Sequence, residues 1–231
     1  VSTLGSFALI LRLLAHGLAG MPAVWTQMLM AIAVLSLLIG NIIAIAQTNL
    51  TRMLAYSAIS NAGFILLGFA TGRVEGYEAA LFFTIAYVLT TLGAFGMILM
   101  LARRGMEHDE IADFKGLNSR DPLLAALMLV LMFSTAGVPP FIGFWGKLWI
   151  IQALLHGSHV WVATFAVLIS VVGAFYYLRV VWYMYFEPAG DRPVPDARLR
   201  FRFILALNAA AVVVLGVLPN SLLSLCTRLV S

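Results

Sequence analysis

Long apolar runs alternate with short polar breaks along the whole chain. Seven runs can be recognised, at about residues 1–15, 23–46, 50–71, 77–102, 122–155, 160–186 and 201–218. Most of them reach the roughly 20 residues that a helix needs to cross the hydrocarbon core of a membrane. The pattern therefore predicts an all-α, polytopic transmembrane bundle of about seven spans.

The fifth run contains a break that the other runs lack. Pro139 and Pro140 remove two backbone donors in succession, and Gly137 and Gly143 flank them. In hydrocarbon an unpaired backbone group costs several kcal/mol, so a broken helix persists only where it is buried in protein or lines a wet cavity. The run from 122 to 155 is therefore predicted to be one discontinuous helix.

Composition agrees with the hydropathy pattern. The 231 residues are 62% hydrophobic and 10% charged, whereas a soluble domain is about 45–50% apolar and about 25% charged. The chain is expected to form a single membrane domain over residues 1–231, with the lipid bilayer around it. The net charge of +4 is a property of the loops and does not indicate nucleic acid, and the single Cys226 excludes an internal disulfide.

The basic residues predict an orientation. Connections on one side carry nine Lys and Arg residues, and connections on the other carry three. The richer side has Arg52, Arg103, Arg104, Lys115, Arg120, Arg192, Arg198, Arg200 and Arg202, against Arg12, Arg73 and Arg228. Because Lys and Arg near spans favour the cytoplasmic face, the chain is predicted to start on the cytoplasmic side and end on the outer side.

Lys147 follows the helix break and is the main candidate for chemistry. All ten acidic residues lie in loops or at helix ends, so no carboxylate of this chain is expected beside Lys147 at membrane depth. A lysine inside a membrane is by default a functional-site hypothesis, and a buried amine holds its proton less tightly than an exposed one. A proton relay is favoured over a lysine that snorkels to the interface or has a structural role.

Polar side chains gather on the third and fourth runs, where Ser57, Ser60, Asn61 and Tyr87 occur. Such groups commonly bond back to carbonyls of their own helix or join neighbouring helices. They also both donate and accept hydrogen bonds, so they could order water along a proton path. The sequence leaves both interpretations open.

The remaining polar positions are weaker candidates. Arg179 is explained by anchoring at the cytoplasmic interface, and the spacing of His156 and His159 could suit a metal but lacks a third ligand. No nucleotide-binding glycine loop, cysteine cluster or haem motif appears. We therefore expect this chain to bind no cofactor and no metal, and to do no redox chemistry itself.

Several motifs together resemble the antiporter-like subunits of respiratory complex I. The segment from Gln47 to Gly63, QTNLTRMLAYSAISNAG, is similar to a helix junction of that family. The segment from Ala136 to Lys147, AGVPPFIGFWGK, is similar to the family's second discontinuous helix with its proton-carrying lysine. The motifs DFKGL, from Asp113, and GAFYYLRVVWYMYF, from Gly173, favour the subunit N branch of bacterial NADH–quinone oxidoreductase.

The resemblance implies more than the residues show. Family members have about fourteen spans built from two inverted five-helix repeats. This chain would be the C-terminal part, with residues 23–187 as the second repeat and residues 200–226 as a final helix. It would sit in the bacterial inner membrane, ending on the periplasmic side, beside other membrane-arm subunits, while NADH and quinone are used elsewhere in the complex.

Two alternatives to a proton-translocating subunit of the oxidoreductase remain at this point. One is a subunit of a multisubunit cation/proton antiporter, which belongs to the same family. The other is a passive membrane scaffold. Two departures from the family pattern bear on the inward half of a proton path: Asn61 stands where the family typically has histidine, and Thr3 aligns where it places a further lysine.

Overall fold

The computed structural model describes residues 2–13, 22–101, 110–189 and 199–230. Within these ranges every regular element is a helix, and an isolated bridge joins Asn49 and Glu110. The helices are α1 Ser2–Arg12, α2 Pro22–Ala46, α3 Leu50–Ala70, α4 Val74–Leu101, the 3₁₀ turn Ile111–Phe114, α5 Leu117–Arg120, α6 Pro122–Ala136, α7 Ile142–His156, α8 Val160–Tyr185, α9 Leu199–Val217 and α10 Pro219–Val230. The all-α prediction is confirmed.

Five helices are long and apolar enough to cross a membrane, namely α2, α3, α4, α8 and α9. α6 and α7 have 15 residues each, about 22 Å apiece, and together they form the predicted discontinuous helix. α1 has 11 described residues, or about 16 Å, which is half of a typical hydrocarbon core. The described part of the chain therefore shows six crossings and one short helix, where seven spans were expected.

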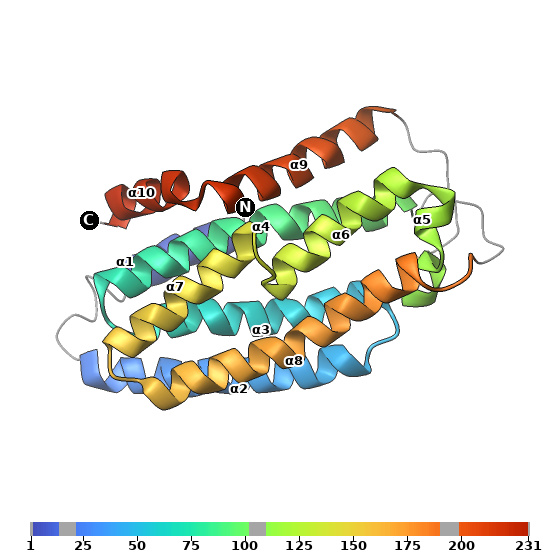
Figure 1. Cartoon of the computed structure of the whole chain (residues 1–231). Coiled ribbons are helices and arrows are strands. Elements are labelled where there is room, and N and C mark those ends of the chain that lie inside the picture. Colours follow the sequence, from blue (N-terminus) through green and yellow to red (C-terminus); the bar gives the residue numbers. More distant parts are fainter. Residues whose placement is uncertain (1, 14–21, 102–109, 190–198, 231) are drawn as a thin grey trace.

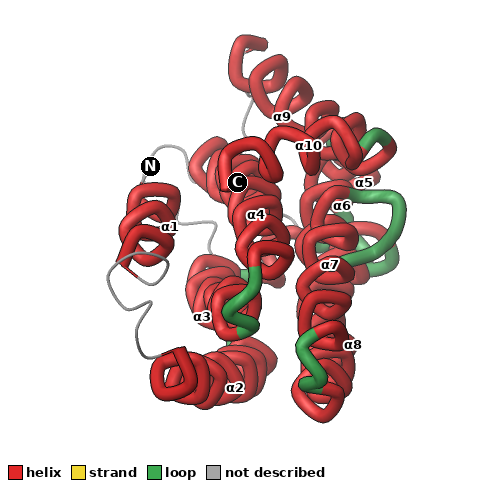
Figure 2. The backbone as a smooth tube through the Cα atoms, turned by 90° about the vertical axis from the view of Figure 1, so that its left-hand side faces the viewer, coloured by secondary structure: helices red, strands yellow, loops and turns green. Residues whose placement is uncertain are grey.

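The helices lie roughly along one common direction (Figure 1). Seen from the end, α2 and α3 form one side, α6, α7 and α8 the other, and α9 with α10 covers a third side (Figure 2). α4 lies between them and contacts α3, α6, α7, α9 and α10. The broken helix is therefore enclosed by α4 on one side, by α8 on another and by α9 across the break.

The end of the chain differs from the expected single helix over 200–226. α9 stops at Val217 and a separate helix, α10, starts at Pro219. Proline has no N–H to continue the helix, and it disfavours helical backbone at Leu218 before it. α10 then packs on α4 with Cys226 buried.

The polar loop at residues 106–121, between the fourth and fifth apolar runs, is partly helical. Residues 106–109 lie outside the described residues, but the remainder forms the 3₁₀ turn and α5. The Ile111 and Leu117 side chains are buried, and Asp121 accepts a hydrogen bond from Leu124 N as the N-cap of α6. The loop thus closes one end of the bundle.

We call this end of the bundle the basic end. It carries Arg52 at the start of α3, Lys115 just before α5, Arg120 at the end of α5, and Arg200 and Arg202 at the start of α9. Arg12, Arg73 and Arg228 belong to the opposite end. Four further arginines that the sequence assigns to the side richer in Lys and Arg lie outside the described residues, namely Arg103, Arg104, Arg192 and Arg198.

Candidate functional site

The helix break is a turn of five residues between α6 and α7. Gly137 caps α6 in the left-handed conformation, with φ of 91°, which glycine adopts without steric cost. Its N–H bonds to Ser134 O at 3.1 Å, and Val138 N bonds to Phe133 O at 3.0 Å, as in a Schellman cap. The cis Pro139–Pro140 peptide follows, and α7 begins at Ile142.

Lys147 completes the hydrogen bonding of the broken end. A helix leaves its last four carbonyls without a partner in the helix, and in α6 these belong to residues 133–136. Backbone N–H groups of the turn satisfy Phe133 O and Ser134 O. The Lys147 ammonium donates to the other two, Thr135 O at 3.0 Å and Ala136 O at 3.1 Å.

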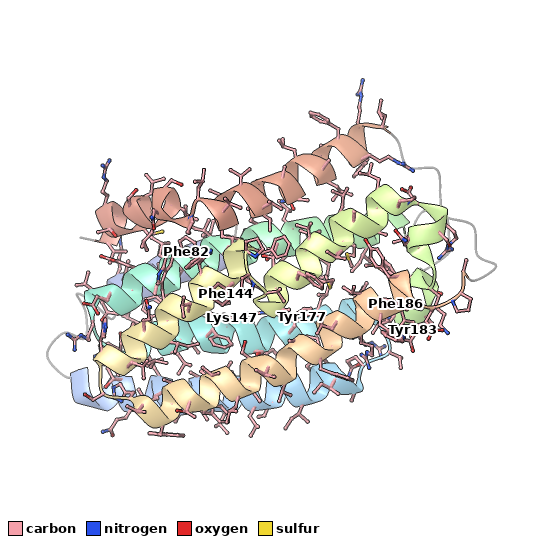
Figure 3. All side chains as sticks on the ribbon, in the orientation of Figure 1. Phe82, Phe144, Lys147, Tyr177, Tyr183 and Phe186 are labelled. Atoms are coloured by element: carbon pink, nitrogen blue, oxygen red, sulfur yellow. The ribbon has the colours of Figure 1, made fainter. Side chains whose placement is uncertain are left out.

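The direction of the lysine follows from its place in α7. Side chains of a helix lean toward its N-terminus, so a residue in the second turn of α7 points back to the break. Gly137 leaves room there, since a Cβ at that position would lie 3.2 Å from Lys147 Cδ. Lys147 is consequently only 8% exposed, and Figure 3 shows it in the middle of the bundle.

Two further groups contact the ammonium. It lies 3.4 Å from Ser170 Oγ on α8 and 5.3 Å from the centroid of the Phe64 ring on α3. Within the described ranges, Asp121 pairs with Arg202 and Glu187 pairs with Lys115, so neither of these carboxylates pairs with Lys147. The partner of the Lys147 charge is therefore the negative end of the α6 dipole, and no carboxylate of the described residues pairs with it.

The two halves of the broken helix are held together by close backbone contacts. Gly143 N donates to Ser134 Oγ at 3.3 Å, and a Cβ on Gly143 would clash with Ser134 O. On the far side, Trp145 Nε1 donates to Gly216 O of α9 at 2.8 Å. These contacts fix α7, and hence Lys147, against the end of α6.

Ser60 belongs to a buried polar cluster that spans three helices. Asn41 Nδ2, on α2, donates to Ser60 Oγ at 2.6 Å and to Leu37 O at 2.7 Å. The Tyr176 hydroxyl, on α8, donates to Asn41 Oδ1 at 3.2 Å. The sequence reasoning missed Asn41 and Tyr176; an asparagine in an otherwise apolar helix was the signal that could have found the first.

Ser57 and Asn61 lie in the same cluster, beside Tyr177. Asn61 Nδ2 donates to Ser57 O at 2.9 Å and contacts the Tyr177 hydroxyl at 3.4 Å. Ser57 Oγ donates to Leu54 O at 2.7 Å, and the Tyr176 and Tyr177 ring centroids are 4.4 Å apart. The predicted residues of α3 are thus brought together, partly through bonds to their own helix and partly across to α8.

The remaining candidate residues are Tyr87, Arg179 and Thr3. Tyr87 is half-buried on α4, and its hydroxyl interacts with Thr91 on the same helix and lies within electrostatic reach of Tyr177. Arg179 donates to Ile45 O at 3.0 Å and Gln47 O at 2.6 Å, so it caps α2. The Thr3 side chain lies outside the described residues.

The two histidines of the α7–α8 junction do not act together. His156 Nδ1 lies 2.9 Å from Glu75 Oε2, and both side chains are exposed. His159 is the N-cap residue of α8. Among the described residues, no group of three His, Cys, Asp or Glu side chains could hold a metal ion.

Comparison with known proteins gives consistent similarities. Residues 1–173 match the transmembrane family described as NADH:quinone oxidoreductase/Mrp antiporter. The chain is 51% identical, over 229 residues, to NADH-quinone oxidoreductase subunit N of Thioalkalivibrio sulfidiphilus. That alignment covers 99% of this chain and 48% of the relative, so the chain spans about half the length of the curated relative.

Solved structures show the same fold. A chain of respiratory complex I from Thermus thermophilus with bound aureothin is 31% identical, with a TM-score of 0.76 over 86% of this chain and 45% of that one. A chain of the Mrp complex from a Dietzia species is 21% identical, with a TM-score of 0.86 over 97% of this chain and 50% of that one. The second likeness concerns the fold alone.

Proposed function

Because the chain belongs to the NADH:quinone oxidoreductase/Mrp antiporter family of transmembrane proteins, we propose that it is part of a subunit N that moves protons across the membrane. One observation carries this proposal: Lys147 is buried at a helix break and donates to two carbonyl groups at the end of α6 that have no partner within that helix. A lysine in that position can take up and release a proton without a permanent counter-charge.

The energy balance at Lys147 favours such a switch. An isolated charge at membrane depth costs at least a few kcal/mol, and a helix C-terminus returns up to about 2 kcal/mol in a partly buried geometry. The ammonium is therefore stabilised only in part. A small change in hydration, or in charge on a neighbouring subunit, is enough to move the amine between its charged and neutral forms.

The polar cluster of Asn41, Ser57, Ser60, Asn61, Tyr176 and Tyr177 supplies the approach to the lysine. Its hydroxyls and amides each donate and accept, so they can order water molecules. Ser170 contacts Lys147. The same serine lies one turn before Gly173, which packs on Asn41. Protons would pass along this line from one side of the membrane and leave from Lys147 toward the other.

The wider setting follows the family. NADH and quinone would react in other subunits of the complex, and this chain would bind neither, contacting instead other membrane-arm subunits. We place the protein in a bacterial inner membrane with the basic end in the cytoplasm, as expected for Lys and Arg near spans. Residues 23–187 would form the second five-helix repeat.

The test is Lys147→Ala in the assembled complex, with electron transfer and proton uptake measured separately in vesicles. Lys115→Ala is the matched control, because Lys115 is the other lysine of the chain and pairs with Glu187 at the surface. We expect Lys147→Ala to reduce proton uptake per electron pair, and Lys115→Ala to leave it unchanged. Normal pumping by Lys147→Ala would remove this lysine from the mechanism.

The same vesicles distinguish the cation/proton antiporter alternative. Sodium-dependent proton exchange without NADH would assign the chain to an antiporter. Co-purification with flavin and iron–sulfur subunits, together with NADH-driven uptake, would assign it to the oxidoreductase.

A further inference from the structure

An apolar groove lies at the basic end of the bundle, away from Lys147. It is lined by Leu123 near the start of α6 and by residues between 199 and 206 of α9, and its volume is about 770 Å³. Its apolar wall includes Leu123, Phe203, Ile204 and Ala206, and its charged wall is Arg200 and Arg202. None of these residues takes part in the proposed proton path.

The two arginines of the groove are not equivalent. Arg202 Nη2 lies 2.6 Å from Asp121 Oδ2, so its charge is already balanced. Arg200 is exposed, and within the described ranges no ion pair joins it to a carboxylate. Among the described residues, the groove therefore presents one guanidinium without a carboxylate partner beside an apolar wall.

The charged and apolar groups of the groove follow one another along α9 as the headgroup and the acyl chain do in a phospholipid. Arg200 is the second residue of the helix, where the span meets the interface. Ala206 lies six residues further along, about 9 Å deeper into the membrane. A charged group at the interface with an apolar channel below it is complementary to a phosphate headgroup with an acyl chain.

We propose that this groove binds an anionic phospholipid, whose phosphate contacts Arg200 and whose acyl chain lies along Phe203, Ile204 and Ala206. The planar guanidinium fork matches phosphate oxygens, and basic pockets between spans on the cytoplasmic side bind anionic headgroups. The proposal rests on the groove, its charge and the cytoplasmic placement of the basic end proposed above, and it stands whether or not Lys147 carries protons.

The test measures lipid binding to the full-length protein in its complex. Native mass spectrometry would follow titration with dioleoyl-phosphatidylglycerol and, separately, with dioleoyl-phosphatidylcholine. Arg200→Gln should weaken binding of the phosphatidylglycerol by about fivefold, the contribution of one basic residue near an anionic surface. Ala206→Phe should fill the groove and reduce occupancy by either lipid.

Two matched variants control for general effects. Arg52→Gln removes another exposed arginine from the basic end, and Ala210→Phe adds a ring to an exposed position of α9 outside the groove. Both should bind the phosphatidylglycerol like the wild type. Equal affinity of the wild type for the two lipids, equal loss in Arg52→Gln and Arg200→Gln, or a neighbouring subunit cross-linked through position 204 would each overturn the proposal.

Discussion

The ammonium nitrogen of Lys147 lies 3.0 Å from the carbonyl oxygen of Thr135, twelve residues earlier in the chain. This contact makes the lysine and the helix break one unit. Without the break, Thr135 O would bond within the helix and offer nothing to the cation. Without the lysine, two terminal carbonyls of α6 would lack a partner inside a membrane, where each unpaired group costs several kcal/mol.

Gly137→Ala should disturb this unit. The left-handed backbone at Gly137, φ 91°, costs an alanine roughly 1–2 kcal/mol. The new methyl group would also lie 3.2 Å from Lys147 Cδ and 3.4 Å from its ammonium nitrogen, which displaces the amine from the carbonyls. We expect a lower free energy of unfolding together with slower proton uptake in vesicles.

Gly72→Ala separates the two effects. Gly72 also has a left-handed backbone, with φ of 62°, but among the described residues a Cβ there would meet only Thr26 Cγ2, at 3.4 Å. This variant should lose similar stability and keep the wild-type rate of proton uptake. Equal rates in both variants would show that the position of the amine does not limit proton transfer.

Tyr177→Phe should slow proton transfer with little loss of stability. The substitution keeps the buried ring and removes the hydroxyl that contacts Asn61 at 3.4 Å. Loss of a positioned proton-transfer group typically reduces a rate by about a hundredfold or more, so at least about a tenfold fall in proton uptake is expected here. Stopped-flow measurement with a pH-sensitive dye in vesicles would detect it.

Tyr183 provides the control, six residues nearer the basic end on the same helix (Figure 3). Its ring contacts Lys115, whose ammonium lies 5.2 Å from the ring centroid, and it is separate from the polar cluster. Tyr183→Phe should pump normally. If both variants pump at the wild-type rate, the Tyr177 hydroxyl is not part of the path.

The sequence predicted the break and the lysine because both signals are local. Consecutive prolines cannot continue a helix, and a lysine in an apolar run stands out by composition alone. The sequence did not show what balances the lysine, because the partner is a helix end and not a side chain. Every residue carries a backbone carbonyl, so residue identity does not mark which carbonyls lie at a helix end.

The polar cluster was only half predicted for a related reason. Ser57, Ser60 and Asn61 are neighbours on one helix and could be found together. Asn41 and Tyr176, by contrast, are 135 residues apart and meet through the packing of α2 on α8. Periodicity identifies which residues are helical, but the pairing of helices decides which polar groups share a hydrogen bond.

The Asn41–Tyr176 hydrogen bond should be measurable by a double-mutant cycle. Asn41→Ala removes the amide that bonds to Ser60 and Tyr176, at a cost of about 1–3 kcal/mol in the free energy of unfolding. Tyr176→Phe should cost less, and the coupling should lie near about 0.6–1.7 kcal/mol, the range for hydrogen bonds between membrane helices. Unfolding in mixed detergent micelles gives all three values.

Thr84→Val is the comparison for that cycle. Thr84 is fully buried, and its hydroxyl donates to Ala80 O on its own helix at 2.7 Å. A bond of this kind adds little to helix stability, so the substitution should cost under about 1 kcal/mol. A coupling of zero between Asn41 and Tyr176 would mean that their contact does not hold α2 against α8.

The ion pair at the basic end should contribute more to stability than its surface counterpart. Asp121 caps α6 and lies 2.6 Å from Arg202 of α9, with side chains 9% and 28% exposed. Asp121→Ala removes the cap and leaves a half-buried guanidinium unpaired, a loss of about 2–4 kcal/mol. Glu187→Ala breaks the Lys115–Glu187 pair, which is 3.5 Å long with side chains 37% and 33% exposed. Such a pair is worth at most about 1 kcal/mol. Comparable losses in the two variants, measured by unfolding in micelles, would show that the Asp121–Arg202 pair does not hold α9 to α6.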